Sequence, residues 1–317
     1  MWLTEAELGN RYSTDIKPCF EGGAEGSMLA LDGVPLHYRL FIPKGAETLV
    51  LLCTGRTESV FKYQELIFEL QRQGIAVAAL DHRGQGLSGR QTEDPHLGFV
   101  EDFQHYAEDL KQFVDQLVLP LGFKRHWLLA HSMGGCVAAL YLERHGHPFE
   151  KVAMTSPMFS INTAPFPLWV ARGMARWQSQ QDKRKGRHRY VPTAGPFKKP
   201  AFDENGVSHS RLRFDLCQHW LEVMPDARLG GPSAQWLHAA FQAMDEAVAG
   251  AGAIQVPVLV VAAGEDKVVS LGGQRAFVDA LPLGELHQMA GAWHELLLES
   301  DAYRQPTLDL IWQFFQG

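Results

Sequence analysis

Long hydrophobic runs are absent: no stretch reaches about 18 uninterrupted apolar residues, the length that a membrane-spanning helix needs. The first residues lack the basic start and the apolar core of a signal peptide. Positive charge is not in excess either, with 29 Lys and Arg against 36 Asp and Glu, which argues against a dedicated nucleic-acid-binding protein. These absences predict a cytoplasmic protein that can lie against the inner face of the membrane.

Cysteine is scarce, and its spacing excludes two further classes. The four cysteines are Cys19, Cys53, Cys136 and Cys217; they are far apart and form no C-x-x-C pair. Small disulfide-stabilised domains and zinc ribbons need denser patterns than this. The cysteines are therefore expected to be reduced thiols packed in the interior.

Motifs for phosphate-binding cofactors and metals are also weak. Gly84 and Gly86 follow an apolar run, but the third glycine of a dinucleotide fingerprint is missing. His145 and His147 have no third ligand in a convincing pattern. We expect neither cofactor nor metal, and we expect Asp81 and Arg83, beside these glycines, to pin the loop instead.

The patterns that are present predict an α/β protein. Residues 27–43 alternate around a turn at Asp32 and Gly33, which predicts an antiparallel hairpin. Apolar runs typical of strands covered on both faces follow, separated by stretches with helical spacing. The expected strands are 48–53, 75–80, 127–131, 152–155, 256–263 and 285–289, and the expected helices include 63–73, 100–119, 274–281 and 295–315. This alternation predicts a mostly parallel sheet with helices on both sides, and chemistry at the carboxyl ends of its strands.

One of these strand ends holds a serine in a small-residue turn. The run 127–131 stops at Ser132 and restarts as a helix at Met133, Gly134 and Gly135. A sharp strand-to-helix turn exposes a serine hydroxyl as a nucleophile, and only small residues fit around it. The usual pattern is G-x-S-x-G, and here Ala130 replaces the first glycine. The alternative is an ordinary buried turn with a capping serine.

Activation of a serine needs a histidine and an acid, which two later strand ends supply. Asp266 follows the strand 256–263, and His294 follows the strand 285–289. The order serine, aspartate, histidine is the one expected in an open α/β sheet. Glu265 is the rival acid, but Asp266 precedes the apolar Val268, which should anchor the loop. The alternatives are an N-cap aspartate and a histidine at the start of a helix.

Two backbone amides are candidates for the oxyanion hole, which stabilises the tetrahedral intermediate. The amide of Met133 lies at a helix start, where N–H groups have no partner within the helix. The amide of Arg56 follows Gly55 in the loop after the strand 48–53. The Arg56 guanidinium would in addition attract an anionic substrate.

Several of these stretches together resemble a known family. They are TGRTES (54–59), DHRGQGLSG (81–89), AHSMGG (130–135), GEDKVV (264–269) and WHE (293–295), with RLGGPS (228–233) and Trp236-Leu237 farther along. This set resembles the α/β-hydrolase group of monoacylglycerol lipases and bacterial lysophospholipase L2, over about residues 25 to 315. The resemblance implies Ser132 as nucleophile, His294 as general base and acid, Asp266 as its orienting partner, and the Arg56 and Met133 amides as the oxyanion hole.

Two departures from the family pattern stand out. Ala130 replaces the usual glycine and does not threaten the mechanism. Thr54 replaces the histidine usual in monoacylglycerol lipases, so the loop is more similar to that of the lysophospholipase L2 branch.

The region 159–253 differs in composition from the rest and is expected to be a mainly helical cap, inserted into a core of residues 1–158 and 254–317. It holds twelve Lys and Arg against eight Asp and Glu, and four of the eight tryptophans, Trp169, Trp177, Trp220 and Trp236. Positive charge with aromatic surface suits a lipid interface, although aromatics at helical spacing also serve as cap core. We expect substrate binding and any membrane contact in this region.

Together these features predict a serine hydrolase of single-chain lipid esters, either lysophospholipids or monoacylglycerols. A short-chain carboxylesterase and a non-catalytic lipid- or protein-binding scaffold are the alternatives. The head group, the acyl-chain preference and the oligomeric state do not follow from the sequence.

Overall fold

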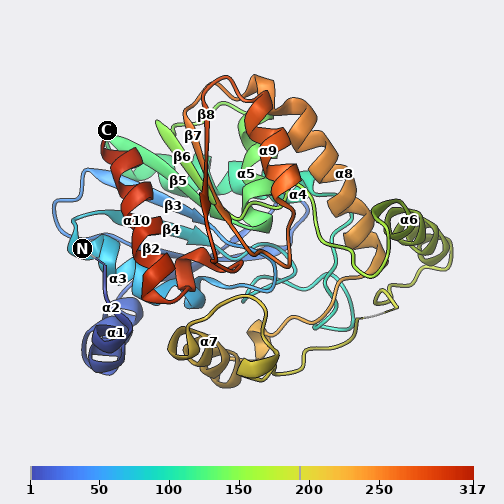
Figure 1. The fold of residues 1–317 in the computed structure, drawn as a ribbon, viewed down its shortest axis with the longest axis horizontal. Helices are drawn as coiled ribbons and strands as arrows, with labels where there is room; N and C mark the ends of the chain where they lie inside the picture. The colour runs from blue at the N-terminus through green and yellow to red at the C-terminus, as the bar shows by residue number, and fades with distance from the viewer. Residues whose placement is uncertain (1, 193) are drawn as a thin grey trace.

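The computed structural model describes residues 2–192 and 194–317 and contains an eight-stranded sheet (Figure 1). The strand order is β1-β2-β4-β3-β5-β6-β7-β8. β2 pairs antiparallel with β1 and with β4, and every pair from β4 to β8 is parallel. The strands are β1 (Ala24–Leu29), β2 (Pro35–Phe41), β3 (Thr48–Cys53), β4 (Ala76–Leu80), β5 (Arg125–His131), β6 (Lys151–Thr155), β7 (Val258–Ala263) and β8 (Gly284–Met289). The predicted hairpin and mostly parallel sheet are confirmed.

The central strands are buried on both faces because their side chains alternate between two cores. On β3, Leu49 and Leu51 belong to one core cluster, whereas Val50 and Leu52 belong to the other. All six residues of β3 are buried. This double burial explains why the central strands are continuous apolar runs.

Helices cover both faces of the sheet (Figure 1). The buried residues of α4 (Gln104–Phe113), α5 (Met133–Arg144), α8 (Ala234–Gly250) and α9 (Leu271–Ala280) pack in the first cluster. The buried apolar residues of α2 (Lys17–Glu21), α3 (Gln64–Arg72) and α10 (Asp301–Gln316) pack in the second, except Phe68 of α3, which packs with the N-terminal helices. Among the described residues, no helix combines the length and apolar character needed to cross a membrane.

Three predicted helices have different bounds in the structure. The helix expected at 274–281 is α9, which begins three residues earlier. The helix expected at 100–119 begins at Gln104, whose amide donates to the Asp102 carboxylate (2.9 Å). After Phe113 the α-helix continues as a turn of π-helix and then a turn of 3-10 helix. The helix expected at 295–315 is divided: a short 3-10 turn at Leu296–Leu298 precedes α10. Apolar periodicity continued through both breaks, so it did not reveal them.

The first helix, α1 (Glu5–Arg11), is absent from the sequence-based expectation although the sequence carries its signal. The Thr4 hydroxyl accepts from the Glu7 amide, and the Glu7 carboxylate accepts from the Thr4 amide, which is a capping box. The spacing of threonine and glutamate three residues apart was sufficient to locate this helix start.

Between β6 and β7 the chain leaves the sheet and forms α6 (Leu168–Arg184) and α7 (Arg211–Val223) before it returns through α8 (Figure 1). α7 is fixed to the core by a buried ion pair, in which Arg213 donates to the Glu65 carboxylate (2.8 and 2.9 Å). Arg213 also donates to the Glu299 carbonyl (2.6 Å). α8 contributes Trp236 and Phe241 to the core beneath it.

Candidate active site

Ser132 occupies a strained turn between β5 and α5. Its backbone has φ 51° and ψ −119°, a conformation that residues other than glycine rarely adopt. Hydrogen bonds hold it there: the Ser132 amide donates to the Thr155 carbonyl (3.0 Å), and the Met158 amide donates to the Ser132 carbonyl (2.9 Å). A Cβ atom at Gly134 would lie 2.3 Å from the Cys53 carbonyl oxygen, so this position requires glycine, as the sequence predicts.

The structure brings Ser132, His294 and Asp266 together in a hydrogen-bonded chain. Nε2 of His294 lies 2.9 Å from Oγ of Ser132, and Nδ1 lies 2.7 Å from Oδ2 of Asp266. Because Nδ1 faces a carboxylate, it carries the ring proton, and Nε2 is free to accept the serine proton. This is the geometry needed for a serine nucleophile activated by a general base.

Asp266 rather than Glu265 contacts the histidine. Its Oδ1 accepts from the amides of Val268 (2.8 Å) and Val269 (2.9 Å), which orients Oδ2 toward His294, whereas Glu265 is exposed. Burial alone would raise the pKa of Asp266, but the hydrogen bonds from His294 and from these amides lower it below the usual value. The Asp266 carboxylate is therefore ionised at neutral pH.

The loop after β3 starts against the serine turn, because the Cys53 and Thr54 carbonyl oxygens face Gly134. The Gly55 carbonyl accepts from Nε2 of Gln85 (2.7 Å), and the Gly55 amide donates to the Glu58 carboxylate. Since the peptide is planar and trans, fixing the Gly55 carbonyl toward Gln85 turns the Arg56 N–H away from it. The Met133 amide lies at the first position of α5, without an acceptor one turn earlier in the helix.

The Arg56 side chain joins this loop to the segment before α8. Its Nη2 donates to the Gly230 carbonyl (2.7 Å), and its guanidinium carbon lies 4.9 Å from the Trp236 ring centroid. No carboxylate pairs with Arg56 among residues 2–192 and 194–317, and burial lowers its pKa to about 10. Within the described part of the chain, the guanidinium is thus a cation without a carboxylate partner, held against Gly230 and Trp236.

Asp81 and Arg83 pin the surrounding loops as expected. The Asp81 carboxylate accepts from the Ser59 hydroxyl (2.9 Å) and from the Val60 amide (2.8 Å). Arg83 forms ion pairs with Asp109 (2.6 Å) and Asp32 (2.7 Å). The Asp81 bonds hold the segment after β4 against the loop that carries Arg56, and the Arg83 ion pairs hold it against the hairpin turn and α4.

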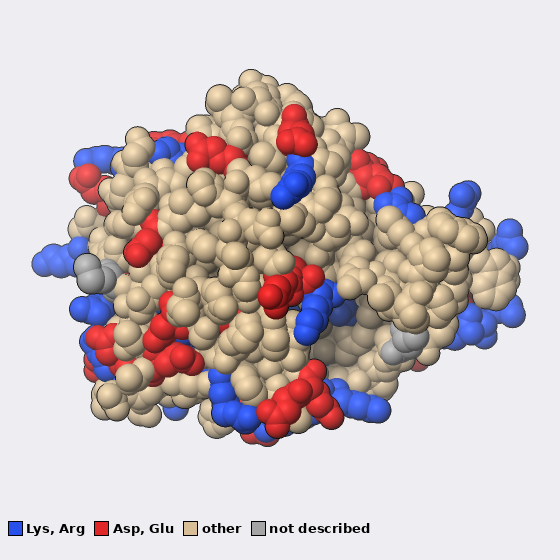
Figure 2. Space-filling model, in the orientation of Figure 1, with Lys and Arg blue, Asp and Glu red and all other residues tan. Residues whose placement is uncertain are grey.

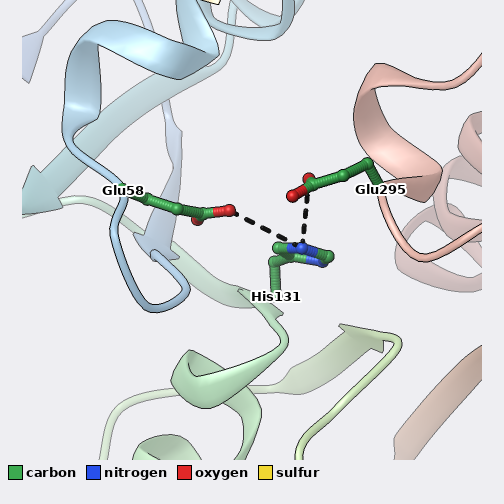
Figure 3. A group of neighbouring side chains, drawn as sticks. All are labelled: Glu58, His131 and Glu295. Atoms are coloured by element: carbon green, nitrogen blue, oxygen red, sulfur yellow. Dashed lines mark ion pairs between the residues drawn. The ribbon is translucent and has the colours of Figure 1, made fainter. Parts of the chain in front are cut away.

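Sequence reasoning missed a buried polar cluster beside the serine (Figure 3). His131 points between the carboxylates of Glu58 and Glu295, which lie 3.7 and 3.2 Å from its Nε2. The ligand atoms of these three side chains lie within 4.8 Å of one another, which is compatible with a metal site. Nζ of Lys62, however, contacts Glu58 and lies 2.7 Å from Glu295, so an ammonium group already supplies a cation there.

An apolar cavity of about 430 Å³ lies under α6. Its wall includes Ile161 and Phe166 from the loop after β6, Ala171 and Met174 from α6, and Leu237 from α8. The same loop begins next to Met158, whose amide binds the Ser132 carbonyl. One wall of the cavity thus belongs to the loop whose first residues are hydrogen-bonded to the serine turn.

A mostly parallel sheet, a strained serine at the end of β5, and an aspartate and a histidine after β7 and β8 define an α/β-hydrolase. Residues 44–301 match the family model Hydrolase_4, described as serine aminopeptidase S33. The chain belongs to this family, and within it to the group of lysophospholipases and monoacylglycerol lipases.

Individual relatives cover nearly the whole chain. Lysophospholipase L2 of Escherichia coli K12 is 34% identical over 298 residues, which are 92% of this chain and 87% of that protein. Monoacylglycerol lipase of Mycolicibacterium smegmatis is 25% identical over 88% of this chain and 92% of its own length. Among solved structures, a soluble variant of Saccharomyces cerevisiae monoglyceride lipase bound to a substrate analogue has a TM-score of 0.72, with 19% identity, over 93% of this chain and 94% of that one. This structural likeness supports the fold.

Proposed function

We propose that the protein hydrolyses carboxylic esters of single-chain lipids, lysophospholipids or monoacylglycerols, through an acyl-enzyme on Ser132. The observation that carries the proposal is the position of His294, hydrogen-bonded to Ser132 on one side and to Asp266 on the other. The names of the relatives, lysophospholipase L2 and monoacylglycerol lipase, support the substrate class.

The mechanism follows from the position of each group. Oγ of Ser132 attacks the ester carbonyl carbon while Nε2 of His294 takes its proton. The amides of Met133 and Arg56 donate to the resulting oxyanion, and each such donor contributes on the order of 3 kcal/mol. His294 then protonates the leaving alcohol, and the C–O bond of the ester breaks. In the second half, His294 activates a water molecule that releases the fatty acid and returns the proton to Ser132.

The acyl chain is assigned to the apolar cavity under α6. Its wall combines Ile161, Met174 and Leu237 with few polar groups, as an alkyl chain requires. All the residues that line it lie within 159–253, which we propose as the cap over a core of residues 1–158 and 254–317. The Arg56 guanidinium, which has no carboxylate partner among the described residues, favours substrates with an anionic head group.

The outer face of α6 has the composition of an interfacial helix. Trp169 and Trp177, two turns apart, are 77% and 64% exposed. The exposed Arg176 and Arg184 share that face, and none of the described residues forms an ion pair with either of them. Figure 2 shows Lys and Arg gathered around the lobe that α6 forms in Figure 1. Exposed indole rings beside cations suit the headgroup region of an anionic membrane, so we propose that α6 makes peripheral membrane contact.

A substrate panel tests the proposal. The wild type is expected to release fatty acid from lysophosphatidylglycerol or monoacylglycerol in preference to short soluble esters, and to react with a fluorophosphonate probe. Ser132→Ala should lose both activities, with an unchanged unfolding temperature. A preference for short soluble esters would indicate a carboxylesterase, and a wild-type chain that does not react with the probe would indicate a binding scaffold.

A further inference from the structure

A buried network of four charged or ionisable side chains lies directly behind the proposed nucleophile. It consists of Glu58 and Lys62 from the segment after β3, His131 from the end of β5, and Glu295 from the segment after β8 (Figure 3 shows three of them). The side chains of His131 and Glu58 are only 1% and 3% exposed, and those of Glu295 and Lys62 are 15% and 17% exposed. The mechanism proposed above uses none of these side chains.

The partners of the His131 ring determine its protonation state. Nδ1 lies 3.1 Å from the Thr155 carbonyl and 3.0 Å from the Thr155 hydroxyl. That hydroxyl directs its own proton to the Ala130 carbonyl (3.5 Å), so both oxygens of Thr155 face the ring as acceptors. Nδ1 must therefore carry a hydrogen atom.

The other ring nitrogen also faces only acceptors. Nε2 lies 3.2 Å from Glu295 and 3.7 Å from Glu58, in an ion-pair contact rather than a well-aligned hydrogen bond. A neutral ring with its proton on Nδ1 would direct a lone pair at two carboxylates. This repulsion is removed when Nε2 is protonated as well, because opposite charges at this distance attract strongly in a buried site.

We propose that His131 is an imidazolium in the resting enzyme and that, with Lys62, it neutralises the two buried carboxylates, so that the network positions the catalytic groups around Ser132. Two positive and two negative charges then balance. Burial alone lowers the pKa of His131, but the nearby Glu295 and Glu58 raise it above its usual value, which agrees with this assignment. The inference rests on the proposed function for its kinetic part only.

The network connects both sides of the proposed active site. The Glu58 carboxylate accepts from the Gly55 amide and from the Tyr63 hydroxyl, and so fixes the loop that presents the Arg56 amide. Glu295 follows His294 directly, and its own amide donates to the Val207 carbonyl (2.9 Å). The four side chains thus link the proposed oxyanion loop to the histidine segment, and they are positioning residues rather than catalytic ones.

The charge of the network acts on the catalytic histidine at short range. The ring centroids of His131 and His294 are 5.0 Å apart. The groups that face this pair are Glu58, Lys62, Glu295 and Asp266, with the Cys217 thiol of α7 beside Lys62. Removing one charge from a balanced network leaves an uncompensated charge next to His294. A negative charge there favours protonation of His294, and a positive charge disfavours it.

Variants that change the charge of the network in opposite directions test whether the network controls the protonation of His294. Glu295→Gln leaves a net positive charge, so the midpoint of the acid limb of the kcat/KM profile should move to lower pH. His131→Gln leaves a net negative charge and should move it to higher pH, each by roughly one pH unit. The double variant restores neutrality and should return the midpoint close to that of the wild type. Glu285→Gln, an exposed site on β8, is the control.

Shifts of both single variants in the same direction, or losses of kcat without any shift, would overturn the proposal. If these variants do not fold, Lys62→Gln, at the more exposed member of the network, should move the midpoint to higher pH, and no movement would count against the proposal.

A measurement on the wild type separates this inference from the proposed function. In protein labelled with ¹⁵N-histidine, both ring nitrogens of His131 should be protonated at neutral pH, with the signal assigned by its loss in His131→Gln or, if that variant is unfolded, by through-bond correlation. A neutral ring would contradict the proposal. If the wild type cleaves no ester on the panel, the proposed function fails, while the protonation state of His131 is still decided.

Discussion

The hydroxyl of Ser156 donates a hydrogen bond to the backbone carbonyl of His294, 2.8 Å away. Ser156 directly follows β6, has a positive φ (43°) and is fully buried. The bond ties the main chain of the proposed general base to the segment after β6. No motif of the sequence indicated this contact, because it joins residues 138 positions apart.

Ser156→Ala should lower kcat about five- to tenfold with little change in KM. The physical reason is the loss of one buried hydrogen bond, worth about 1 kcal/mol, at a group whose position matters most in the transition state. Steady-state kinetics on a soluble ester would measure it. Ser160→Ala, in the same loop, is the control, and an unchanged kcat in Ser156→Ala would rule out a positioning role for this bond.

Asp266→Asn should lower kcat by roughly four orders of magnitude, as expected when the orienting carboxylate of such a triad becomes an amide and favours the wrong histidine tautomer. Glu265→Gln is the matched control because Glu265 is adjacent but exposed. The rate of fluorophosphonate labelling should fall in parallel with kcat. Comparable losses in both variants would mean that Asp266 has no special role.

Gly134→Ala should destabilise the protein by roughly 2 kcal/mol and strongly reduce probe labelling, because the added methyl group meets the Cys53 and Thr54 carbonyls at 2.3 and 2.6 Å. Ala130→Gly is the comparison variant, at the first small-residue position of the serine turn. It restores the usual family glycine and should keep the labelling rate, at a cost of about 1 kcal/mol for glycine within a strand. Thermal unfolding and labelling kinetics would measure both effects.

Apolar runs and small-residue turns in the sequence predicted most of the strands and the serine turn. They did not predict where three of the helices begin. The strand β3 was predictable because double burial imposes an apolar run, and the turn at Ser132 because sterics impose glycine at 134. The breaks before Gln104 and Asp301 depend on capping and on 3-10 turns, which leave the apolar periodicity intact.

The cluster around His131 could not be predicted from the sequence. Its members come from three separate segments, and each alone reads as an ordinary polar residue. Their proximity exists only because β3, β5 and the segment after β8 end at the same edge of the sheet. The balance between the two carboxylates and the two cations of this cluster can therefore be recognised only from the structure.

Glu143 makes the stability of the protein depend on pH. Burial raises the pKa of its carboxyl to about 8, against about 4.5 in the unfolded chain. The folded state thus holds a proton that the unfolded state has lost, so the free energy of unfolding should fall as the pH rises between these two values.

Glu143→Gln should remove this fall, and raise the free energy of unfolding on the order of 1–2 kcal/mol at pH 9 with little effect at pH 4, after allowance for partial exposure. Urea titrations at both pH values would measure it. The exposed Glu108→Gln is the control. The same gain at both pH values would show that packing, and not ionisation, is responsible.

Replacing Trp169 and Trp177 together by Ala should weaken binding to phosphatidylglycerol vesicles at least tenfold, because each indole that leaves the interface loses about 1.5–3 kcal/mol of apolar burial. Hydrolysis of a soluble short ester should be unchanged, since these rings point away from the protein. Vesicle co-sedimentation would measure binding, and Leu31→Ala, at an 82% exposed position on the hairpin, is the matched control. Binding of the wild type should also fall in high salt, because part of the attraction comes from exposed cations on α6. Equal vesicle binding by the double variant and the wild type would show that α6 is not the membrane-contacting surface, and the acyl chain would then have to reach Ser132 from another side of the cap.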